Sequence, residues 1–205
     1  MADEMTIKDL SQVVVRFAGD SGDGMQLAGT IFSNVSAILG NDIATFPDYP
    51  AEIRAPQGTL SGVSGFQVHV SADKVYTSGD KCDVLVAMNP AALKTNIKFT
   101  TPNSIIIIDV DSFGKKDLEK ALYKTDDAIN ELGITNQVVA VPITTLCKES
   151  LKDSGMDNRS ILRSKNMLAL GFICWLFNYP LEHPEKMLRN KFAKKAAIAE
   201  ANIKV

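Results

Sequence analysis

The sequence predicts an α/β fold of Rossmann-like type, with a mostly parallel sheet, helices on both faces and a β-hairpin insertion. Three observations carry this prediction. An apolar run over 12–18 ends in a glycine-rich turn and is followed by helical spacing of apolar residues. Apolar strand-like runs then alternate with helical segments along the chain, as in parallel sheets. Four consecutive isoleucines within 104–109 indicate a strand buried on both faces.

The first half of the chain supplies most of these elements. After the strand over 12–18, apolar residues at helical spacing predict a helix over 25–39, which Gly40 and Asn41 end. A short strand is expected at 43–46. Loose alternation over 63–70 predicts a strand that pairs with 74–77 across Ala72 and Asp73, which makes the hairpin.

The second half continues the alternation. A buried strand is expected at 83–88, and Asn89 followed by Pro90 is typical of a helix start. After the isoleucine strand, mixed helix is expected over 115–132 and a further strand at 137–141. A single apolar helix over 160–177 and a basic amphipathic helix over 184–202 complete the chain.

Composition and charge exclude several classes of protein. Of the 205 residues, 45% are hydrophobic and 22% charged, which is ordinary for a globular protein. A formal net charge of -2 gives no reason to expect nucleic acid or a membrane as a partner. No apolar run reaches transmembrane length, and the acidic N-terminus has no signal-peptide pattern. The cysteines Cys82, Cys147 and Cys174 are widely spaced, so we expect reduced thiols, a cytoplasmic location and no metal site.

The glycine-rich turn lies where a dinucleotide-binding fold places its phosphate loop. Its spacing is G-x-x-G-x-G, and no lysine follows. Asp20 and Asp23 would repel a pyrophosphate and compete for the backbone N–H groups, which favours a tight turn capped by its own carboxylates. Contact with an anion or cofactor through backbone N–H groups is the alternative. The candidate cofactor-binding residues are Gly19, Asp20, Ser21, Gly22, Asp23 and Gly24.

A proline-rich loop over 45–59 is the second candidate feature. Three prolines stiffen it, which lowers the cost of ordering it on contact. Glu52 and Arg54 stand two apart, so in an extended segment their side chains share one side, and they are the candidate catalytic residues. An ion pair within the loop and a contact with substrate, cofactor or partner chain are equally open. We expect Phe46 and Tyr49 to be packing residues.

Three stretches resemble the gamma domain of 2-oxoacid:ferredoxin oxidoreductases: 19–26, 46–56 and 58–64. The closest branch is 2-oxoglutarate:ferredoxin oxidoreductase, in which this domain is often fused to the N-terminus of the alpha subunit. The similarity extends to 192–195 and 200–202 and covers nearly the whole chain. Where the wider family has Tyr-Gly-x-Glu-x-Arg-Gly-Gly, this chain keeps Tyr, Glu and Arg but replaces the glycines with Pro, Ala and Pro. That change stiffens the loop and leaves open which 2-oxoacid is the substrate.

The resemblance implies a component of a complex that decarboxylates a 2-oxoacid on thiamine diphosphate, forms acyl-coenzyme A and reduces ferredoxin through Fe–S clusters. It implies that thiamine diphosphate, Mg and the Fe–S clusters are held mainly by other domains and subunits. The residues agree: Gly22, Asp23 and Gly24 suggest a thiamine motif, but 48–54 contain no Asn partner, and the cysteines do not cluster. We expect this domain to bind no cofactor alone and to be inactive without its partners. Those partners are the rest of a fused alpha chain, a beta subunit and, indirectly, ferredoxin.

The domain organisation expected is one gamma-type domain over 1–205, excised from a longer fused alpha subunit, because the last helix has no terminating residues. Its role is to complete the active site and the approach of coenzyme A and the 2-oxoacid. A non-catalytic module that only supports its neighbours is the alternative. A free-standing nucleotide-binding protein is disfavoured by the absence of G-x-G-x-x-G.

Overall fold

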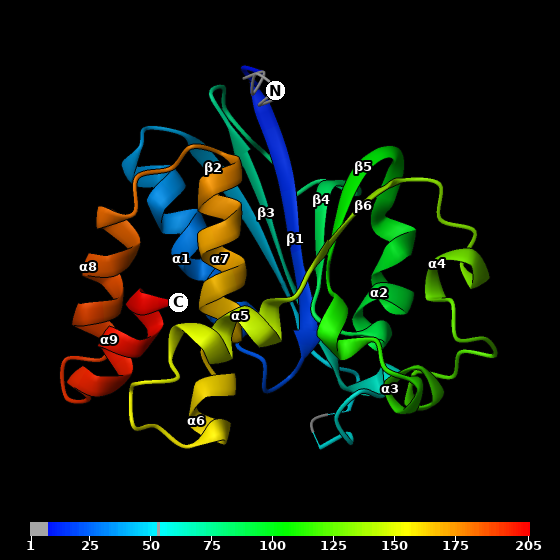
Figure 1. Cartoon of the computed structure of the whole chain (residues 1–205). Coiled ribbons are helices and arrows are strands. Elements are labelled where there is room, and N and C mark those ends of the chain that lie inside the picture. Colours follow the sequence, from blue (N-terminus) through cyan, green and yellow to red (C-terminus); the bar gives the residue numbers. More distant parts are fainter. Residues whose placement is uncertain (1–7, 53) are drawn as a thin grey trace, which may run out of the picture.

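A six-stranded sheet forms the centre of the molecule (Figure 1). The computed structural model describes residues 8–52 and 54–205. The strand order is β2-β3-β1-β4-β5-β6. The strands are β1 (Gln12–Asp20), β2 (Asp42–Asp48), β3 (Val63–Ser71), β4 (Cys82–Ala87), β5 (Thr100–Asp109) and β6 (Gln137–Val141). Strands β1, β4, β5 and β6 pair in parallel, whereas β3 is antiparallel to both β1 and β2.

Helices cover both faces of this sheet, as predicted (Figure 1). The first group, on one side, is α1 (Met25–Ile38), α5 (Ile143–Ser150), α6 (Asn158–Leu162), α7 (Lys165–Leu176), α8 (Glu182–Lys191) and α9 (Ala196–Lys204). The second group, on the other side, is α2 (Pro90–Asn96), α3 (Lys115–Lys120) and α4 (Ala128–Glu131). Short 3₁₀ turns are η1 (Leu60–Gly62), η2 (Ile97–Phe99) and η3 (Val110–Ser112). No helix of the described ranges is long and apolar enough to cross a membrane.

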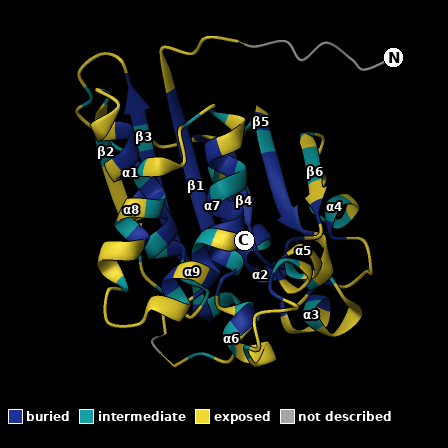
Figure 2. Ribbon diagram, turned by 60° about the vertical axis from the view of Figure 1, so that its left-hand side comes forward, coloured by how far each residue is buried: buried dark blue, intermediate teal, exposed yellow. Residues whose placement is uncertain are grey.

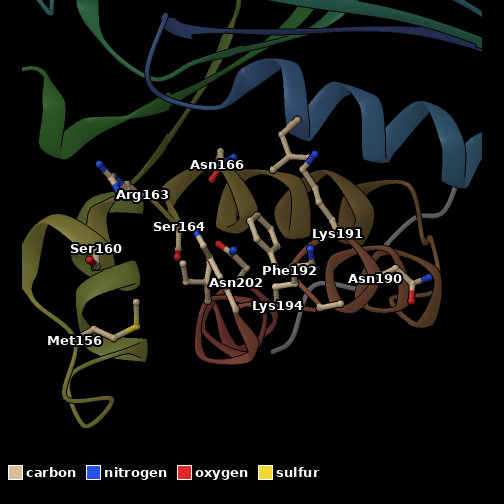
Figure 3. A pocket seen from close by; sticks show the side chains of 14 residues that line it. Met156, Ser160, Arg163, Ser164, Asn166, Asn190, Lys191, Phe192, Lys194 and Asn202 are labelled. Carbon is tan, nitrogen blue, oxygen red and sulfur yellow. The ribbon is translucent and has the colours of Figure 1, made fainter.

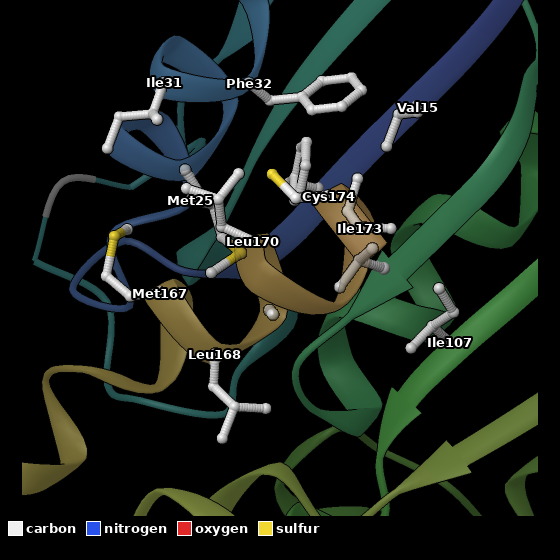
Figure 4. Close-up of a cluster of buried hydrophobic side chains, with 14 of the residues drawn as sticks. Val15, Met25, Ile31, Phe32, Ile107, Met167, Leu168, Leu170, Ile173 and Cys174 are labelled. Carbon is white, nitrogen blue, oxygen red and sulfur yellow. The ribbon is translucent and has the colours of Figure 1, made fainter. Parts of the chain in front are cut away.

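Strand β1 divides the core into two layers, because alternate side chains of a strand point to opposite faces. Val13, Val15 and Phe17 join the core on the α1 and α7 side, and Val14 and Ala18 join the core on the α2 side. The buried centre of the sheet is visible in Figure 2. Figure 4 shows the first of these layers, in which side chains from α1 and α7 meet above β1. The isoleucine strand β5 also contributes to both layers, which confirms its predicted burial.

Local sequence signals explain several element ends. Asn89 accepts a hydrogen bond from the N–H of Ala92 at 2.8 Å and so caps α2, with Pro90 at its first position, as predicted. Gly40 has a φ of 91° where α1 ends, a conformation that favours glycine. Gly29 lets α1 lie directly on β3, because a Cβ there would overlap the ring of Phe66.

Three predicted elements are wrong. Residues 74–77 form no strand, so there is no hairpin across Ala72 and Asp73; β3 pairs instead with β2 and β1. The apolar helix over 160–177 is two helices, α6 and α7, and the basic helix over 184–202 is α8 and α9. The apolar pattern continues across both breaks, so periodicity alone could not show them.

Candidate functional site

The glycine-rich turn sits at the carboxyl end of β1 and leads into α1. Gly24, at the N-cap of α1, has a φ of 74°. A Cβ at Gly24 would overlap the side-chain amide of Asn166, whose Nδ2 donates to the Gly24 carbonyl oxygen at 3.1 Å. The turn is therefore held against the first turn of α7, and a side chain at Gly24 would push the two apart.

The carboxylates of the turn bond to backbone N–H groups. The Asp20 N–H donates to Asp23 Oδ2 at 2.9 Å, so one carboxylate braces the turn from within. Asp20 Oδ2 accepts instead from the N–H of Gly58, also at 2.9 Å. Among the described residues, no N–H of the first turn of α1 donates to either carboxylate, so they brace the turn and the loop and do not cap this helix. Contact of the turn with a cofactor stays a prediction.

The bond from Gly58 to Asp20 joins the two candidate features that the sequence singled out. A second bond, from the Ser21 N–H to the Gly62 carbonyl at 3.0 Å, lies beside it. The proline-rich loop therefore closes over the glycine-rich turn at the carboxyl ends of the strands, the edge where open α/β sheets bind ligands. Sequence reasoning named both segments but did not predict this contact.

The charged pair of the loop faces outward. Glu52 and Arg54 are both exposed, and among the described residues no ion pair joins them, so the loop is not braced in that way. Backbone bonds hold it instead, from the N–H of Glu52 to the Ser61 carbonyl at 3.1 Å and from the N–H of Ala55 to the Glu52 carbonyl at 3.3 Å. Ile53 lies outside the described residues.

The expectation that Phe46 and Tyr49 are packing residues is wrong for this chain. Their side chains are 51% and 70% exposed. Phe46 belongs to β2, which is an edge strand, and that position also accommodates Pro47. The segment therefore exposes apolar side chains as well as the charges of Glu52 and Arg54, and exposed apolar side chains are typical of a contact region.

Sequence reasoning missed Arg16, which anchors the start of the loop. This residue of β1 is 2% exposed. Its guanidinium forms a salt bridge with Asp48, where β2 gives way to the loop. Nε donates to Asn96 Oδ1 at 2.6 Å and Nη1 donates to Gln67 Oε1 at 3.2 Å. The sequence feature that could have identified Arg16 is a lone arginine inside an otherwise apolar strand, because arginine is rarely buried without partners.

The guanidinium of Arg16 also lies 4.0 Å from the ring centroid of Phe99, a cation–π distance. Gly65 of β3 makes room for this side chain, because a Cβ there would lie 3.2 Å from Arg16 Nη2. Arg16 thus ties together β1, β2, β3 and the end of α2, beneath the segment in which the loop begins.

Asp109, at the carboxyl end of β5, is a second residue that sequence reasoning missed. It is 0% exposed, and Lys165 Nζ lies 2.8 Å from its Oδ2. The Thr144 hydroxyl donates to Oδ2 at 2.7 Å and the Thr144 N–H donates to Oδ1 at 3.2 Å. Burial acts to raise the pKa of Asp109, but Lys165 and the hydrogen bonds outweigh it and lower the pKa below its usual value.

The acids of the turn behave in the opposite way. Burial raises the pKa of Asp20, against the hydrogen bond from Gly58 that lowers it. Burial also raises the pKa of Asp23 to about 6, and the negative charges of Asp20 and Asp109 act in the same direction. The glycine-rich turn therefore contains a carboxyl group that takes up a proton close to neutral pH.

This gives a test by Asp23→Asn, which keeps an oxygen for the Asp20 N–H but removes the charge. An unfolded Asp titrates near 3.8, so between that pH and about 6 the unfolded state of the wild type releases a proton that the folded state keeps. The free energy of unfolding of the wild type therefore falls as pH rises, by about 2–3 kcal/mol from this group. Urea unfolding at pH 4 and pH 7.5 should show the variant gaining that much relative to the wild type. If the unfolding free energies of the two proteins differed by the same amount at both pH values, the raised pKa of Asp23 would be contradicted.

The three cysteines and His69 have structural roles. Cys82, Cys147 and Cys174 are free and buried, and burial raises the pKa of each thiol. Cys147 Sγ lies 3.2 Å from the carbonyl oxygen of Ile161, inside the core. His69 contacts the Thr77 carbonyl at 2.9 Å through Nδ1. Within the described residues, no group of three His, Cys, Asp or Glu side chains is arranged to hold a metal ion.

Comparison with known families and with known sequences points to oxidoreductases in both cases. The model of the family described as pyruvate ferredoxin/flavodoxin oxidoreductase matches residues 14–205. The chain is 48% identical over 195 residues to 2-oxoglutarate oxidoreductase subunit KorA of Mycobacterium tuberculosis. That alignment covers 95% of this chain and 30% of the relative, so the chain spans less than a third of the length of the protein it matches.

Solved structures agree with this result. A 2-oxoglutarate:ferredoxin oxidoreductase from Magnetococcus marinus, with 2-oxoglutarate, coenzyme A and succinyl-CoA bound, superposes with a TM-score of 0.68 at 26% identity. That match covers 95% of this chain and 30% of the other. The gamma subunit of a keto/oxoacid ferredoxin oxidoreductase from Geobacter sulfurreducens superposes with a TM-score of 0.59 at 21% identity, over 94% of this chain and 97% of the other. The second match shows a shared fold over almost the full length of both chains.

Proposed function

Because this chain belongs to the pyruvate ferredoxin/flavodoxin oxidoreductase family, we propose that it is the gamma-type domain of a 2-oxoacid:ferredoxin oxidoreductase. The complex oxidatively decarboxylates a 2-oxoacid, with 2-oxoglutarate as the candidate, to its acyl-coenzyme A and reduces ferredoxin. Thiamine diphosphate with Mg supplies the decarboxylation chemistry and Fe–S clusters accept the electrons. These groups belong to the rest of a fused alpha chain and to a beta subunit, in a cytoplasmic complex.

The observation that carries the proposal is the contact between the glycine-rich turn and the proline-rich loop. The bond from Gly58 to Asp20 fixes the two segments together at the carboxyl ends of the strands. Arg54 and Glu52 then stand exposed on a loop whose shape is set by its prolines and by the Arg16–Asp48 anchor. Such a surface offers a fork-shaped cation, an acid and apolar side chains to a neighbouring domain. It is suited to complete a site that lies on neighbouring domains.

Within this site, each exposed group has a defined chemical capacity. The guanidinium of Arg54 can bind a carboxylate of the 2-oxoacid or a phosphate of coenzyme A through two parallel N–H donors. Glu52 can accept a hydrogen bond or orient the guanidinium of Arg54. Phe46 and Tyr49 give the loop apolar area through which it can exclude water on docking.

Arg54→Ala in the assembled oxidoreductase tests the proposal. Loss of one charge-assisted contact should raise the KM for coenzyme A or for the 2-oxoacid, or lower turnover, by about tenfold, equivalent to about 1.4 kcal/mol. Steady-state kinetics with ferredoxin as acceptor give all three values. Arg159→Ala, at an exposed arginine of α6, is the matched control and should keep wild-type kinetics.

Wild-type turnover and KM values in Arg54→Ala would overturn this role. The result would then favour a module that supports its neighbours without entering the site. Assembly of the complex, followed by gel filtration, distinguishes this alternative from a variant that does not assemble.

A further inference from the structure

A pocket lies between the α6–α7 junction and the segment that joins α8 to α9 (Figure 3). Its volume is about 650 Å³, which is within the range of small-molecule sites. Leu27 of α1 lines it, three residues after Gly24, so it opens beside the glycine-rich turn but does not include the proline-rich loop. Neither sequence reasoning nor the proposed function accounts for this pocket.

The pocket is strongly basic. Arg163, Lys191, Lys194 and Lys195 line it, whereas none of the described residues that line it is acidic. The chain as a whole carries a net charge of -2, so this surface departs from the average. In the described part of the chain, none of these four cations forms an ion pair. A hollow lined by one sign of charge attracts a ligand of the opposite sign.

The start of α9 adds to this potential. Lys195 is the N-cap residue of α9, and neither a side-chain cap nor an acidic residue occupies the first turn of this nine-residue helix. The first N–H groups of a helix have no partner within the helix, and its dipole favours negative charge at this end. Phosphate groups are typical ligands at such an end.

Asn166 provides an independent observation. It is 4% exposed and lines the same pocket. Its Nδ2 donates to the Gly24 carbonyl, which fixes the orientation of the amide, and no donor of the described residues reaches its buried Oδ1. A buried acceptor of this kind destabilises the protein unless it is paired. A ligand that completes this site must therefore offer an N–H or O–H group as well as negative charge.

Phe192 supplies the remaining feature, an aromatic surface. Its half-buried ring stands among the side chains of Lys194, Asn202 and Lys191 in the pocket (Figure 3). Aromatic rings stack on the flat faces of nucleic bases. We propose that this pocket binds a phosphorylated nucleotide, with its phosphates toward the lysines and the start of α9 and a hydroxyl or amine donated to Asn166 Oδ1. This proposal is independent of Arg54 and of any catalytic role of the chain.

Equilibrium binding measured by isothermal titration calorimetry tests the assignment, with ATP, coenzyme A and pyrophosphate as probes. ATP or coenzyme A should bind saturably, more tightly than pyrophosphate, and more weakly as salt rises. Saturable binding of ATP alone assigns a free nucleotide, and binding of coenzyme A alone assigns its nucleotide portion. The double variant Lys194→Gln/Lys195→Gln should weaken binding by at least tenfold. Both lysines are exposed, so the fold should be retained.

The matched control is Lys148→Gln/Lys152→Gln, which removes two exposed lysines that do not line the pocket and should keep wild-type affinity. No saturable binding of ATP or coenzyme A, or equal affinities in the two double variants, would overturn the proposal. Equal affinities for pyrophosphate and ATP would overturn its nucleoside part. Because the assay measures binding and not turnover, failure here leaves the proposed function of the loop intact.

Discussion

Asp48→Ala is expected to lower the free energy of unfolding by about 3 kcal/mol, far more than is usual for a partly exposed surface acid. The reason lies in its partner. Arg16 is 2% exposed, and without Asp48 its guanidinium would remain buried without a counter-ion. Removing one member of a buried pair costs about 3–5 kcal/mol, and the 41% exposure of the Asp48 side chain places the effect at the lower end. Urea unfolding at neutral pH gives the value.

Arg16→Met completes a double-mutant cycle with Asp48→Ala. The single Arg16 variant leaves the amide oxygens of Asn96 and Gln67 unpaired, which should lower the free energy of unfolding by about 2 kcal/mol. In the double variant Asp48→Ala should cost little more, because its buried partner is already gone. Asp73→Ala, at an exposed acid with no ion pair in the described part of the chain, is the control and should change stability by less than about 0.5 kcal/mol. Additive effects in the cycle would show that the pair is not coupled.

Asp109→Ala should lower the free energy of unfolding by about 4 kcal/mol at pH 7. It leaves the Lys165 ammonium without its 2.8 Å partner and the hydroxyl and N–H of Thr144 without their acceptors at the start of α5. The contribution of Asp109 to stability should also depend on pH in a defined direction. The pKa of Asp109 is lowered in the folded state, so its contribution is present above about 3.8 and is lost as pH falls through the folded value.

The difference in unfolding free energy between wild type and Asp109→Ala should therefore shrink in acid. The difference between wild type and Asp23→Asn should instead grow as pH rises from about 3.8 to about 6 and then stay constant. Asp111→Ala is the matched control, because this neighbouring acid is exposed and accepts one bond, from the Thr145 N–H at 2.7 Å. Its effect should be about 1 kcal/mol. A cost in Asp109→Ala no larger than that of the control would contradict the predicted importance of the buried charge.

The strands were predictable wherever a local pattern determines them. The apolar run before the glycine-rich turn, the isoleucine strand and the cap at Asn89 each depend on neighbours in the sequence, and each is confirmed. The position of β3 between β2 and β1 depends on partners distant in sequence, which a search for hairpins cannot see. Helix α5 was missed because polar threonines and lysine dilute its apolar positions.

The candidate site was predictable in its segments but not in its contacts. Glycine spacing and prolines identified the turn and the loop, because both require unusual backbone chemistry. The bonds that join them, from Gly58 to Asp20 and from Arg16 to Asp48, connect residues separated by 38 and 32 positions. A lone charge in an apolar strand shows that a partner must exist, but not which residue supplies it.

The buried cysteines allow local opening of the core to be measured by thiol labelling. Cys82 belongs to the core layer on the α2 side, and Cys147 and Cys174 belong to the layer on the α1 and α7 side. A thiol reagent can modify these sulfurs only when the surrounding structure opens, so labelling rates measure local opening free energies. Mass spectrometry of the labelled peptides would therefore follow each side of the sheet separately, without any probe being introduced.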